Sequence, residues 1–353
     1  MAHKTVYVPI VDFLEEYYQP FGAPPKKTPE LWARILRAAF TPDEKMELPY
    51  STVILSFPKK CMAAGERVWL TDGRYVPVES LVGSDAEVWA YDSGEYRPAE
   101  ATIDFNGPDR LYAIRLKSGR VIKRTGFHPL MTWRGWRPVE ELRVGDRIGV
   151  PLAVPEPAQP EPMDTDLIRF LGYMIGDGSL TGRSTPGFSQ NSGPLLDEMQ
   201  SICERLGLRL VKRGQSSIDY QVVDGGAELC RRFGLLERNS YEHRVPEAIF
   251  RLPNEQLWAF LSALIATDGY VVAGKDRPQS GEIGFTTVSR GLAEDVQALW
   301  ARLGHYPILA TKAMPNGRRA KVSYTLSFRT SQEILTIAPH LHLPGKQDAL
   351  AAA

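Results

Sequence analysis

Two stretches, FLGYMIGDGSL (170–180) and FLSALIATDGYV (260–271), decide the fold of this 353-residue chain. Each is an apolar run with the periodicity of a buried helix, and each stops at Asp-Gly. The small residues Gly172, Gly176, Ala263 and Ala266 would let two such helices approach closely. Paired side by side, the helices would bring Asp177 and Asp268 together where they end, and glycine after the aspartate suits a helix C-terminus.

The surroundings of the two stretches also repeat. Each is followed by polar, strand-like sequence and then by an amphipathic helix that ends in Leu-Gly, LLDEMQSICERLG (195–207) and LAEDVQALWARLG (292–304). Asp177 and Asp268 lie 91 residues apart, and the two Leu-Gly ends keep nearly the same offset. The pattern predicts one α/β unit duplicated over residues 165–348, with two copies packed about a pseudo-twofold axis.

Two neighbouring carboxylates repel one another and call for divalent cations, and oxygen ligands suit Mg²⁺. A metal held there can activate water and stabilise the leaving oxygen in phosphodiester hydrolysis. One apolar helix that ends in Asp-Gly would be an ordinary buried helix; two copies at a repeat spacing are much more specific. The predicted metal ligands are Asp177 and Asp268.

Residues 165–348 resemble the LAGLIDADG (DOD-type) homing endonucleases, in the two-motif form found in inteins. The resemblance includes HRVPEAIF (243–250) before the second motif and SRGLAEDVQALWARLG (289–304) after it. It implies an α+β fold with paired helices and saddle-shaped sheets on double-stranded DNA, and one catalytic aspartate from each motif. Members often carry a lysine in the segment matching HRVP, where this chain has Arg244. Candidate DNA contacts, each also readable as a plain surface charge, are Arg213, Arg244, Arg277, Arg318, Arg319 and Lys321.

Between Cys61 and about Val150 the texture changes to short alternating runs separated by turns, which favours an all-β domain. Three features stand out: a cysteine opening CMAAGERVWLTDGRYVPVESL, TGFHPL with Thr125 and His128, and the closing WRPVEELRVGDRIGVP. In this order they resemble the N-terminal splicing blocks of inteins and of hedgehog-type autoprocessing (Hint) domains, over 61–151. The resemblance implies that the Cys61 sulfur attacks the Lys60–Cys61 amide. His128 would protonate the departing nitrogen, and Thr125 would orient the amide.

A complete intein also needs a C-terminal splicing half that ends in His-Asn. The last asparagine of this chain is Asn316, inside the expected nuclease, so that half is expected to be absent. The chain would then form the thioester and release residues 1–60 without ligating. Either the gene is interrupted or a separate chain supplies the missing half.

Two further segments flank these domains. Five prolines between Pro151 and Pro162 predict an extended linker over 152–164, with a wrapped surface loop as the alternative. Residues 1–60 end in STVILSFPKK (51–60), a strand running into a basic loop, and resemble the start of a phage terminase large subunit. They would be the host segment before the insertion, and the alternative is the strand-loop of any other nucleotide-binding protein.

The composition sets outer limits. Lys+Arg and Asp+Glu both number 42, so no strong overall field draws the chain to DNA, although a local basic groove is compatible with that balance. The cysteines Cys61, Cys203 and Cys230 lack metal-ligand spacing, and the sequence has neither a signal peptide nor a membrane-length apolar run. We expect a cytoplasmic, multidomain protein. Two alternatives stay open: a degenerate endonuclease that binds DNA without cutting it, and a fusion fragment in which splicing is dead.

Overall fold

The computed structural model describes residues 62–92, 95–105, 107–182, 184–214, 218–273, 281–314 and 321–353. Cys61, the host-like segment 1–60, Arg277, Arg318 and Arg319 lie outside the described residues. Packing divides the chain into two compact units, which are treated separately below. The first includes residues 106–114 and 123–150 together with the chain up to Ala63, and the second includes 64–105, 115–122 and 151–353.

The duplicated unit is visible in the sheet topology. The first copy comprises α3 (Thr165–Gly176), β9 (Gly178–Ser179), β10 (Gly187–Ser189), α4 (Pro194–Arg205), β11 (Arg209–Lys212) and β12 (Asp219–Val223). The second comprises α7 (Asn254–Asp268), β13 (Gly269–Val272), β14 (Glu282–Thr287), α8 (Arg290–Arg302), β15 (Ile308–Met314) and β16 (Lys321–Phe328). Their four-stranded antiparallel sheets have the orders β11-β12-β10-β9 and β13-β14-β16-β15. In each copy the second strand lies between the first and the fourth, so the predicted repeat is confirmed as one helix–two strands–helix–two strands motif used twice.

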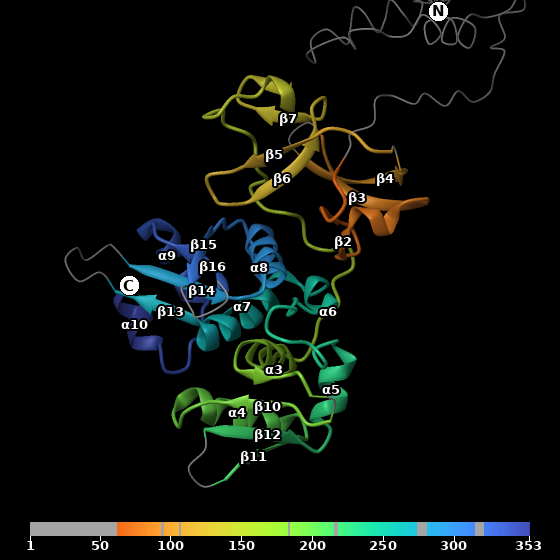
Figure 1. Ribbon diagram of the computed structural model, residues 1–353. Helices are drawn as coiled ribbons and strands as arrows, with labels where there is room; N and C mark the ends of the chain where they lie inside the picture. Colours follow the sequence, from red (N-terminus) through yellow and green to blue (C-terminus); the bar gives the residue numbers. More distant parts are fainter. Residues whose placement is uncertain are drawn as a thin grey trace, which may run out of the picture. The chain divides into compact units, whose positions relative to one another are not determined.

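The copies meet through their first helices. α3 and α7 pack against one another, and α7 also packs on the sheet of its own copy (Figure 1). α3 begins with Asp164 as its N-cap, whose side chain accepts from the backbone N–H groups of Asp166 and Leu167. Seven of its twelve residues are buried, and one continuous apolar core runs through α3, α4, α7, α8 and both sheets.

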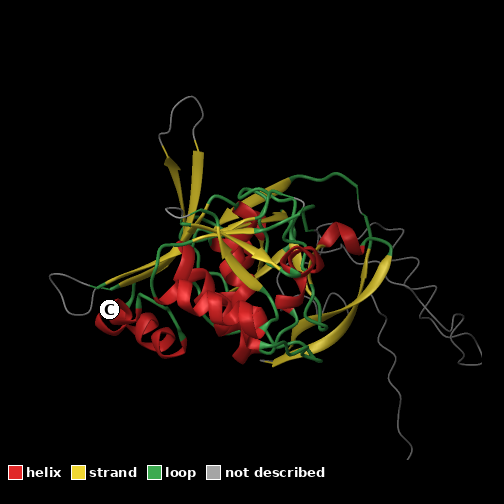
Figure 2. Ribbon diagram, turned by 90° about the horizontal axis from the view of Figure 1, so that it is seen from below, coloured by secondary structure: helices red, strands yellow, loops and turns green. Residues whose placement is uncertain are grey.

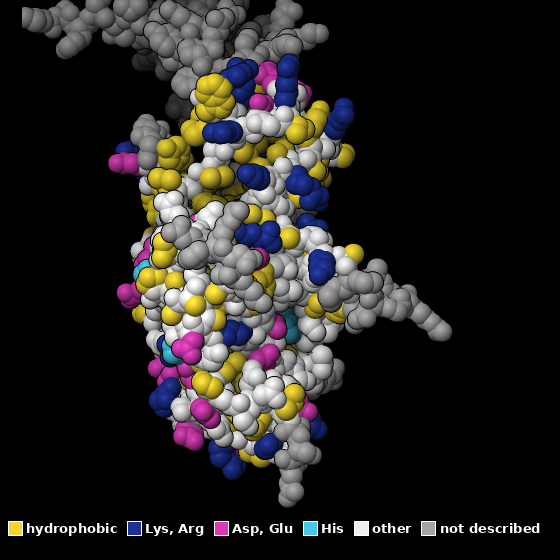
Figure 3. Space-filling view, turned by 90° about the vertical axis from the view of Figure 1, so that its left-hand side faces the viewer, with side chains coloured by type: hydrophobic (Ala, Val, Ile, Leu, Met, Phe, Trp, Pro, Cys, Tyr) yellow, Lys and Arg dark blue, Asp and Glu magenta, His cyan; other side chains and the backbone are white. Residues whose placement is uncertain are grey.

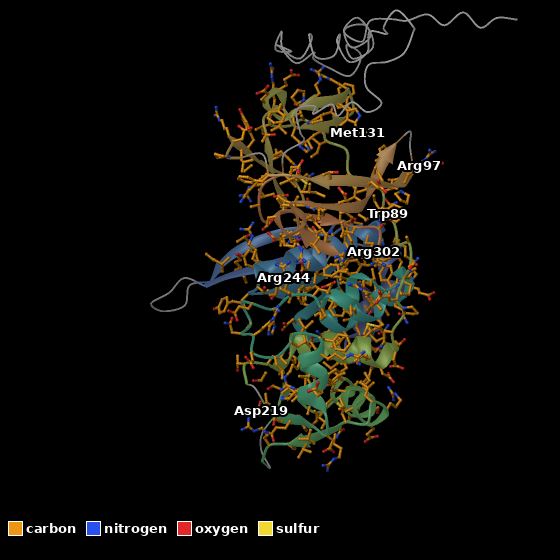
Figure 4. The ribbon with its side chains drawn as sticks, turned by 90° about the vertical axis from the view of Figure 1, so that its right-hand side faces the viewer. Trp89, Arg97, Met131, Asp219, Arg244 and Arg302 are labelled. Atoms are coloured by element: carbon orange, nitrogen blue, oxygen red, sulfur yellow. The ribbon has the colours of Figure 1, made fainter. Side chains whose placement is uncertain are left out.

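Shorter elements complete this unit. α5 (Gly226–Arg232) and α6 (Glu247–Phe250) connect the two copies, and α9 (Ser331–Ile337), η4 (Ala338–His340) and α10 (Gln347–Ala352) follow the second sheet. The fully buried Arg302 at the end of α8 donates to the side-chain oxygen of Asn254 at 2.7 Å and to the carbonyls of Phe250 and Leu252. This residue, labelled in Figure 4, ties α8 to the start of α7.

The β-rich segment does not form the compact all-β domain that the sequence predicts. Its described strands form four separate two-stranded sheets. These pair β1 (Arg67–Trp69) with β2 (Tyr75–Pro77), β3 (Ser84–Asp92) with β4 (Glu95–Ile103), β5 (Leu111–Arg115) with β6 (Val121–Thr125), and β7 (Pro129–Thr132) with β8 (Gly135–Pro138). Single turns η2 (Val78–Leu81) and η3 (Val139–Glu141) adjoin them. Two-stranded ribbons need further strands or a packing surface to be stable.

The proline-rich segment is a loop held to its neighbours by hydrogen bonds. Residues 151–164 have no helix or strand. Val154 N–H donates to the carbonyl of Ala301 at 3.3 Å, and Glu161 N–H donates to that of Arg251 at 2.8 Å. The prolines therefore exclude regular structure as predicted, but the segment is a wrapped surface loop, the alternative to a free linker.

From Thr165 onward helices and antiparallel strands are combined (Figure 2), so this part of the chain is of the α+β class. Among these residues no helix combines the length and the apolar character needed to cross a bilayer.

Candidate active site

The two helices approach most closely at the glycines of α3. A Cβ added to Gly172 would lie 2.6 Å from the Cβ of Ala263, and one added to Gly176 would lie 2.0 Å from the Oγ1 of Thr267. Neither distance is possible for real atoms, so the pairing depends on these residues having no side chain. The predicted role of small residues at this interface is confirmed for Gly172, Gly176 and Ala263.

Both helices end at their aspartates. Asp177 is the C-cap of α3, and Asp268 is the last residue of α7. The glycines that follow are required for space and not for a left-handed turn: Gly269 has φ −102°. A Cβ on Gly178 would lie 2.0 Å from the carbonyl oxygen of Met174, and one on Gly269 would lie 2.5 Å from that of Ile265. Both glycines directly follow the helix ends, as the sequence predicts, and the close approach of the preceding turn explains why a larger residue does not fit.

The two carboxyl groups influence one another electrostatically. Burial and then the charge of Asp177 raise the pKa of Asp268 to about 7, although its side chain keeps contact with solvent. Burial also raises the pKa of Asp177, whereas Lys346 and a 2.8 Å hydrogen bond from Gln190 favour its charged form. The negative charge of Asp177 thus raises the pKa of Asp268, and a pair of carboxylates that interact in this way can hold a cation.

Lys346 is the cation that sequence analysis missed. Its Nζ donates to the carbonyl oxygens of Ile265, Ala266 and Gly269 at 2.9, 2.7 and 2.7 Å, at the C-terminal end of α7. A positive charge is favoured there by the helix dipole. Burial lowers the pKa of Lys346, and Asp177 and Asp268 oppose that shift.

The repeat itself could have revealed this lysine. HLHLP (340–344) near the end of the second copy echoes EHRVP (242–246) near the end of the first, at an offset close to that of the aspartates. Lys346 lies two residues after the second of these segments, beyond Gly345.

The pair of aspartates fits Mg²⁺. Among the described residues there is no cluster of three or more His, Cys, Asp or Glu that could hold a metal, so the carboxylates of Asp177 and Asp268 are the candidate ligands. Mg²⁺ is commonly held by one or two carboxylates, with waters and substrate phosphates completing its shell.

Arg244 is paired with a buried carboxylate. Its Nε and Nη2 donate to the two carboxylate oxygens of Asp295 at 2.7 and 2.6 Å. Arg67 donates to the same carboxylate at 3.2 Å, and the Asp295 side chain is 1% exposed. The guanidinium of Arg244 is therefore paired with a buried carboxylate, and the contact of Arg244 with DNA stays a prediction. Asp295 lies within an amphipathic helix pattern, where an acidic residue is typical of the solvent-facing side. The Arg244–Asp295 ion pair could therefore not be predicted from the sequence.

The remaining DNA candidates are only partly described. Arg213 is exposed after β11, with its backbone N–H bonded to the carbonyl of Asp219. Lys321 opens β16, but its side chain is outside the described set. Basic and acidic side chains both occur on the face shown in Figure 3. This agrees with the equal numbers of basic and acidic residues in the sequence. A DNA interface would have to come from local clusters.

The predicted splicing residues lie in the first unit. Thr125 ends β6 with a side chain 1% exposed, and its Oγ1 has no hydrogen-bond partner among the described residues. His128 N–H donates to the carbonyl of Thr125 at 3.2 Å, closing a turn that places the two residues together. Met62 forms an antiparallel bridge with Arg124, so the residue after Cys61 lies beside the residue before Thr125.

The sequence of this chain is similar to the sequences of several curated proteins. The chain is 27% identical over 311 residues to the replicative DNA helicase DnaB of Rhodothermus marinus, a match covering 83% of this chain and 33% of that protein. It is 28% identical over 290 residues to the RecA protein of Mycobacterium tuberculosis, covering 74% of this chain and 35% of that protein. The chain thus spans about a third of the length of these relatives.

Among solved structures, a variant of the Ssp DnaB mini-intein is 26% identical, with a TM-score of 0.24, and the match covers 29% of this chain and 65% of that one. The homing endonuclease I-DmoI in complex with DNA and Ca is 18% identical, with a TM-score of 0.34, and the match covers 54% of this chain and 98% of that one. Within the chain itself, residues 255–341 match the family model of the LAGLIDADG-like domain.

Proposed function

We propose that residues 165–348 form a metal-dependent endonuclease that cuts double-stranded DNA at a specific long site. The observation that carries the proposal is the pair of aspartates at the ends of two helices packed through Gly172 and Gly176. The LAGLIDADG-like match at 255–341 includes Asp268, and the same topology in the first copy supplies Asp177.

The division of labour among the residues follows from their charges. Asp177 and Asp268 would hold a divalent cation, which when bound activates water and stabilises the leaving oxygen of a phosphodiester. Lys346 places a fixed positive charge on one side of the pair, where it can attract a DNA phosphate and stabilise negative charge that develops on it. The packed helices fix both carboxylates without relying on a flexible loop.

A library experiment tests this function. The purified chain is incubated with Mg²⁺ and a pool of randomised DNA duplexes, and the cut ends are sequenced. A single long consensus site is the expected result. Binding of a consensus duplex without Mg²⁺-dependent cutting would instead identify a DNA-binding protein with a degenerate catalytic site.

We also propose that this nuclease is carried by the N-terminal part of an intein, in which Cys61 opens a splicing segment that extends to about residue 151. Two observations support it. The Met62–Arg124 bridge brings the residue after Cys61 alongside the residue before Thr125, and the buried Thr125 hydroxyl has no hydrogen-bond partner among the described residues. In addition, relatives with different names share with this chain only about a third of their length, as expected when one element is inserted into different hosts.

In this proposal residues 1–60 are the host segment, of a phage terminase large subunit, and a separate chain supplies the C-terminal splicing half. Intact-mass measurement with and without dithiothreitol tests the autoprocessing step, with Cys61→Ala as control. Loss of residues 1–60 that requires both thiol and Cys61 is expected. An unchanged mass in the presence and absence of the complementary half would refute autoprocessing.

A further inference from the structure

A basic site that does not include the two aspartates lies in the nuclease-bearing unit. It is a pocket of about 580 Å³ between the β1–β2 hairpin, the end of α5 and the loop leading into α6. Its wall includes four arginines, Arg67, Arg232, Arg238 and Arg244, and the aromatic residues Tyr75, Phe233 and Phe250.

The charges of this pocket are not balanced. Glu247 is the acidic residue in the wall, and it is paired with Arg251 at 2.6 Å. Arg67 and Arg244 share the single carboxylate of Asp295. Within the part of the chain that the structure describes, Arg232 and Arg238 have no carboxylate partner. Two guanidinium groups thus remain available beside a wall already held in place by the Arg67–Asp295–Arg244 bridge.

The loop that supplies Arg238 and Arg244 is anchored on both sides of a proposed catalytic residue. Glu237 N–H donates to the carbonyl of Leu180 at 2.8 Å, and the backbone of Ile175 hydrogen-bonds His243. Ile175 and Leu180 flank Asp177. The loop that lines the pocket is therefore hydrogen-bonded to the residues around the C-terminal end of α3, where the proposed catalytic aspartate lies.

The bridge is built into the packing of α8. A Cβ on Gly291 would lie 2.4 Å from Nη1 of Arg244, so the helix leaves space for this guanidinium (Arg244 is labelled in Figure 4). Ser289, the N-cap of α8, also donates from its hydroxyl to the carbonyl of His243 at 2.7 Å. These contacts hold the loop independently of any bound ligand.

We propose that this pocket binds a phosphate group of the DNA backbone next to the phosphodiester that is cut, with Arg232 and Arg238 as the contacting residues. The planar fork of arginine matches phosphate oxygens, and charge-assisted bonds of this kind are strong. The inference rests on the proposed DNA cleavage and extends it with a subsite that includes residues of the β-rich segment. Free inorganic phosphate has the same chemistry, and the test separates the two sources.

The test measures binding of the consensus duplex to the full chain by fluorescence anisotropy, without Mg²⁺, over a series of KCl concentrations. Arg232→Ala/Arg238→Ala is compared with Arg231→Ala, which removes a neighbouring arginine of α5 that pairs with Glu228. We expect the double variant to bind about tenfold more weakly at low salt and to lower the slope of log K against log[salt] by about 1. Arg231→Ala should leave both close to the wild type. A repeat with Arg232→Gln/Arg238→Gln, and an unchanged unfolding midpoint, guards against a folding defect.

Equal affinity and slope in the double variant and in Arg231→Ala would overturn the assignment, while DNA cleavage by the wild type would leave the proposed function standing. Inorganic phosphate provides the second arm. If it stabilises the wild type against heat but not the double variant, and DNA binding is unaffected, the pocket takes free phosphate and the DNA assignment is wrong. Absence of any DNA binding by the wild type would overturn both proposals together.

Discussion

At the scale of single residues, Lys346 offers the sharpest test of how the site works. Its ammonium group satisfies carbonyls at the end of α7 and interacts with both aspartates. Lys346→Met should lower the DNA cleavage rate on the order of 100-fold, the usual effect of losing one group that stabilises transition-state charge. Cleavage at saturating Mg²⁺ measures this effect.

A purely structural role for Lys346 predicts a different result. In that case Lys346→Met would lower the unfolding midpoint, and cleavage measured well below that midpoint would be normal. Lys346→Arg keeps the charge at the helix end, so it should retain stability and recover part of the activity. A normal cleavage rate in Lys346→Met, measured well below its unfolding midpoint, would contradict the catalytic assignment.

The aspartate pair also predicts how stability depends on pH. The folded-state pKa of Asp268 is raised from 3.8 to about 7. A raised pKa means that the folded protein holds this proton more tightly than the unfolded chain does. The contribution of this proton to the free energy of unfolding is therefore fully present below pH 3.8. It is lost as the pH rises to about 7.

Thermal unfolding in EDTA between pH 4 and 8 measures this contribution. The midpoint of the wild type should fall relative to that of Asp268→Asn as pH rises, and Mg²⁺ should reverse the fall because it neutralises the carboxylates. Parallel curves for the two proteins in EDTA would show that the carboxylates do not interact as described.

Residue-scale prediction from the sequence succeeded where a pattern was local. Asp177 and Asp268 could be identified because each ends an apolar helix, a signal contained in about ten residues. Lys346 and Asp295 could not, because their partners are distant in sequence and chain folding alone brings them together. The ion pair of Arg244 was unforeseen for the same reason: its carboxylate partner is 51 residues away.

At the scale of elements, the contact between α3 and α7 controls the geometry of the site. Gly176→Ala would place a methyl group 2.0 Å from the hydroxyl of Thr267, so the helices must separate. We expect a loss of about 1–3 kcal/mol of stability, the usual result of overpacking, together with slower cleavage. Urea unfolding and the cleavage assay measure the two effects.

Gly182→Ala is the matched control. Nothing lies within 4 Å of the added methyl group at that position, so stability and cleavage should both be close to those of the wild type. Equal behaviour of the two variants would contradict the close packing of the helices at Gly176.

The elements of the duplicated unit were predictable because periodicity, helix ends and repeat offset all agreed. The arrangement of strands in the β-rich segment was less predictable from the sequence. Alternating runs correctly predicted short strands, but they carry no information about which strands pair, and the described ribbons remain separate. The turn of one ribbon shows what decides such contacts: Ser118, between β5 and β6, accepts from Leu309 of β15 at 2.8 Å. No pattern in the sequence marks that pair.

At the scale of the whole molecule, the described residues proposed for the two activities lie in separate compact units. Thr125 and His128 lie in the unit that contains 123–150, and Asp177 and Asp268 lie in the unit that contains 151–353. His128→Ala should therefore abolish thiol-dependent release of residues 1–60 and leave DNA cleavage unchanged. Asp177→Asn should do the reverse. Mass spectrometry and the cleavage assay, applied to both variants, check the expectation; loss of both activities in either variant would show that the units are coupled.

The central claim is that the two aspartates form one metal-dependent nuclease site. The most direct measurement is Mg²⁺-dependent cutting of the selected duplex by the wild type, Asp177→Asn and Asp268→Asn, with binding affinity determined for each. The account predicts that both substitutions abolish cutting and leave DNA binding in place. Normal cleavage by either variant, or no metal-dependent cleavage by the wild type, would contradict it.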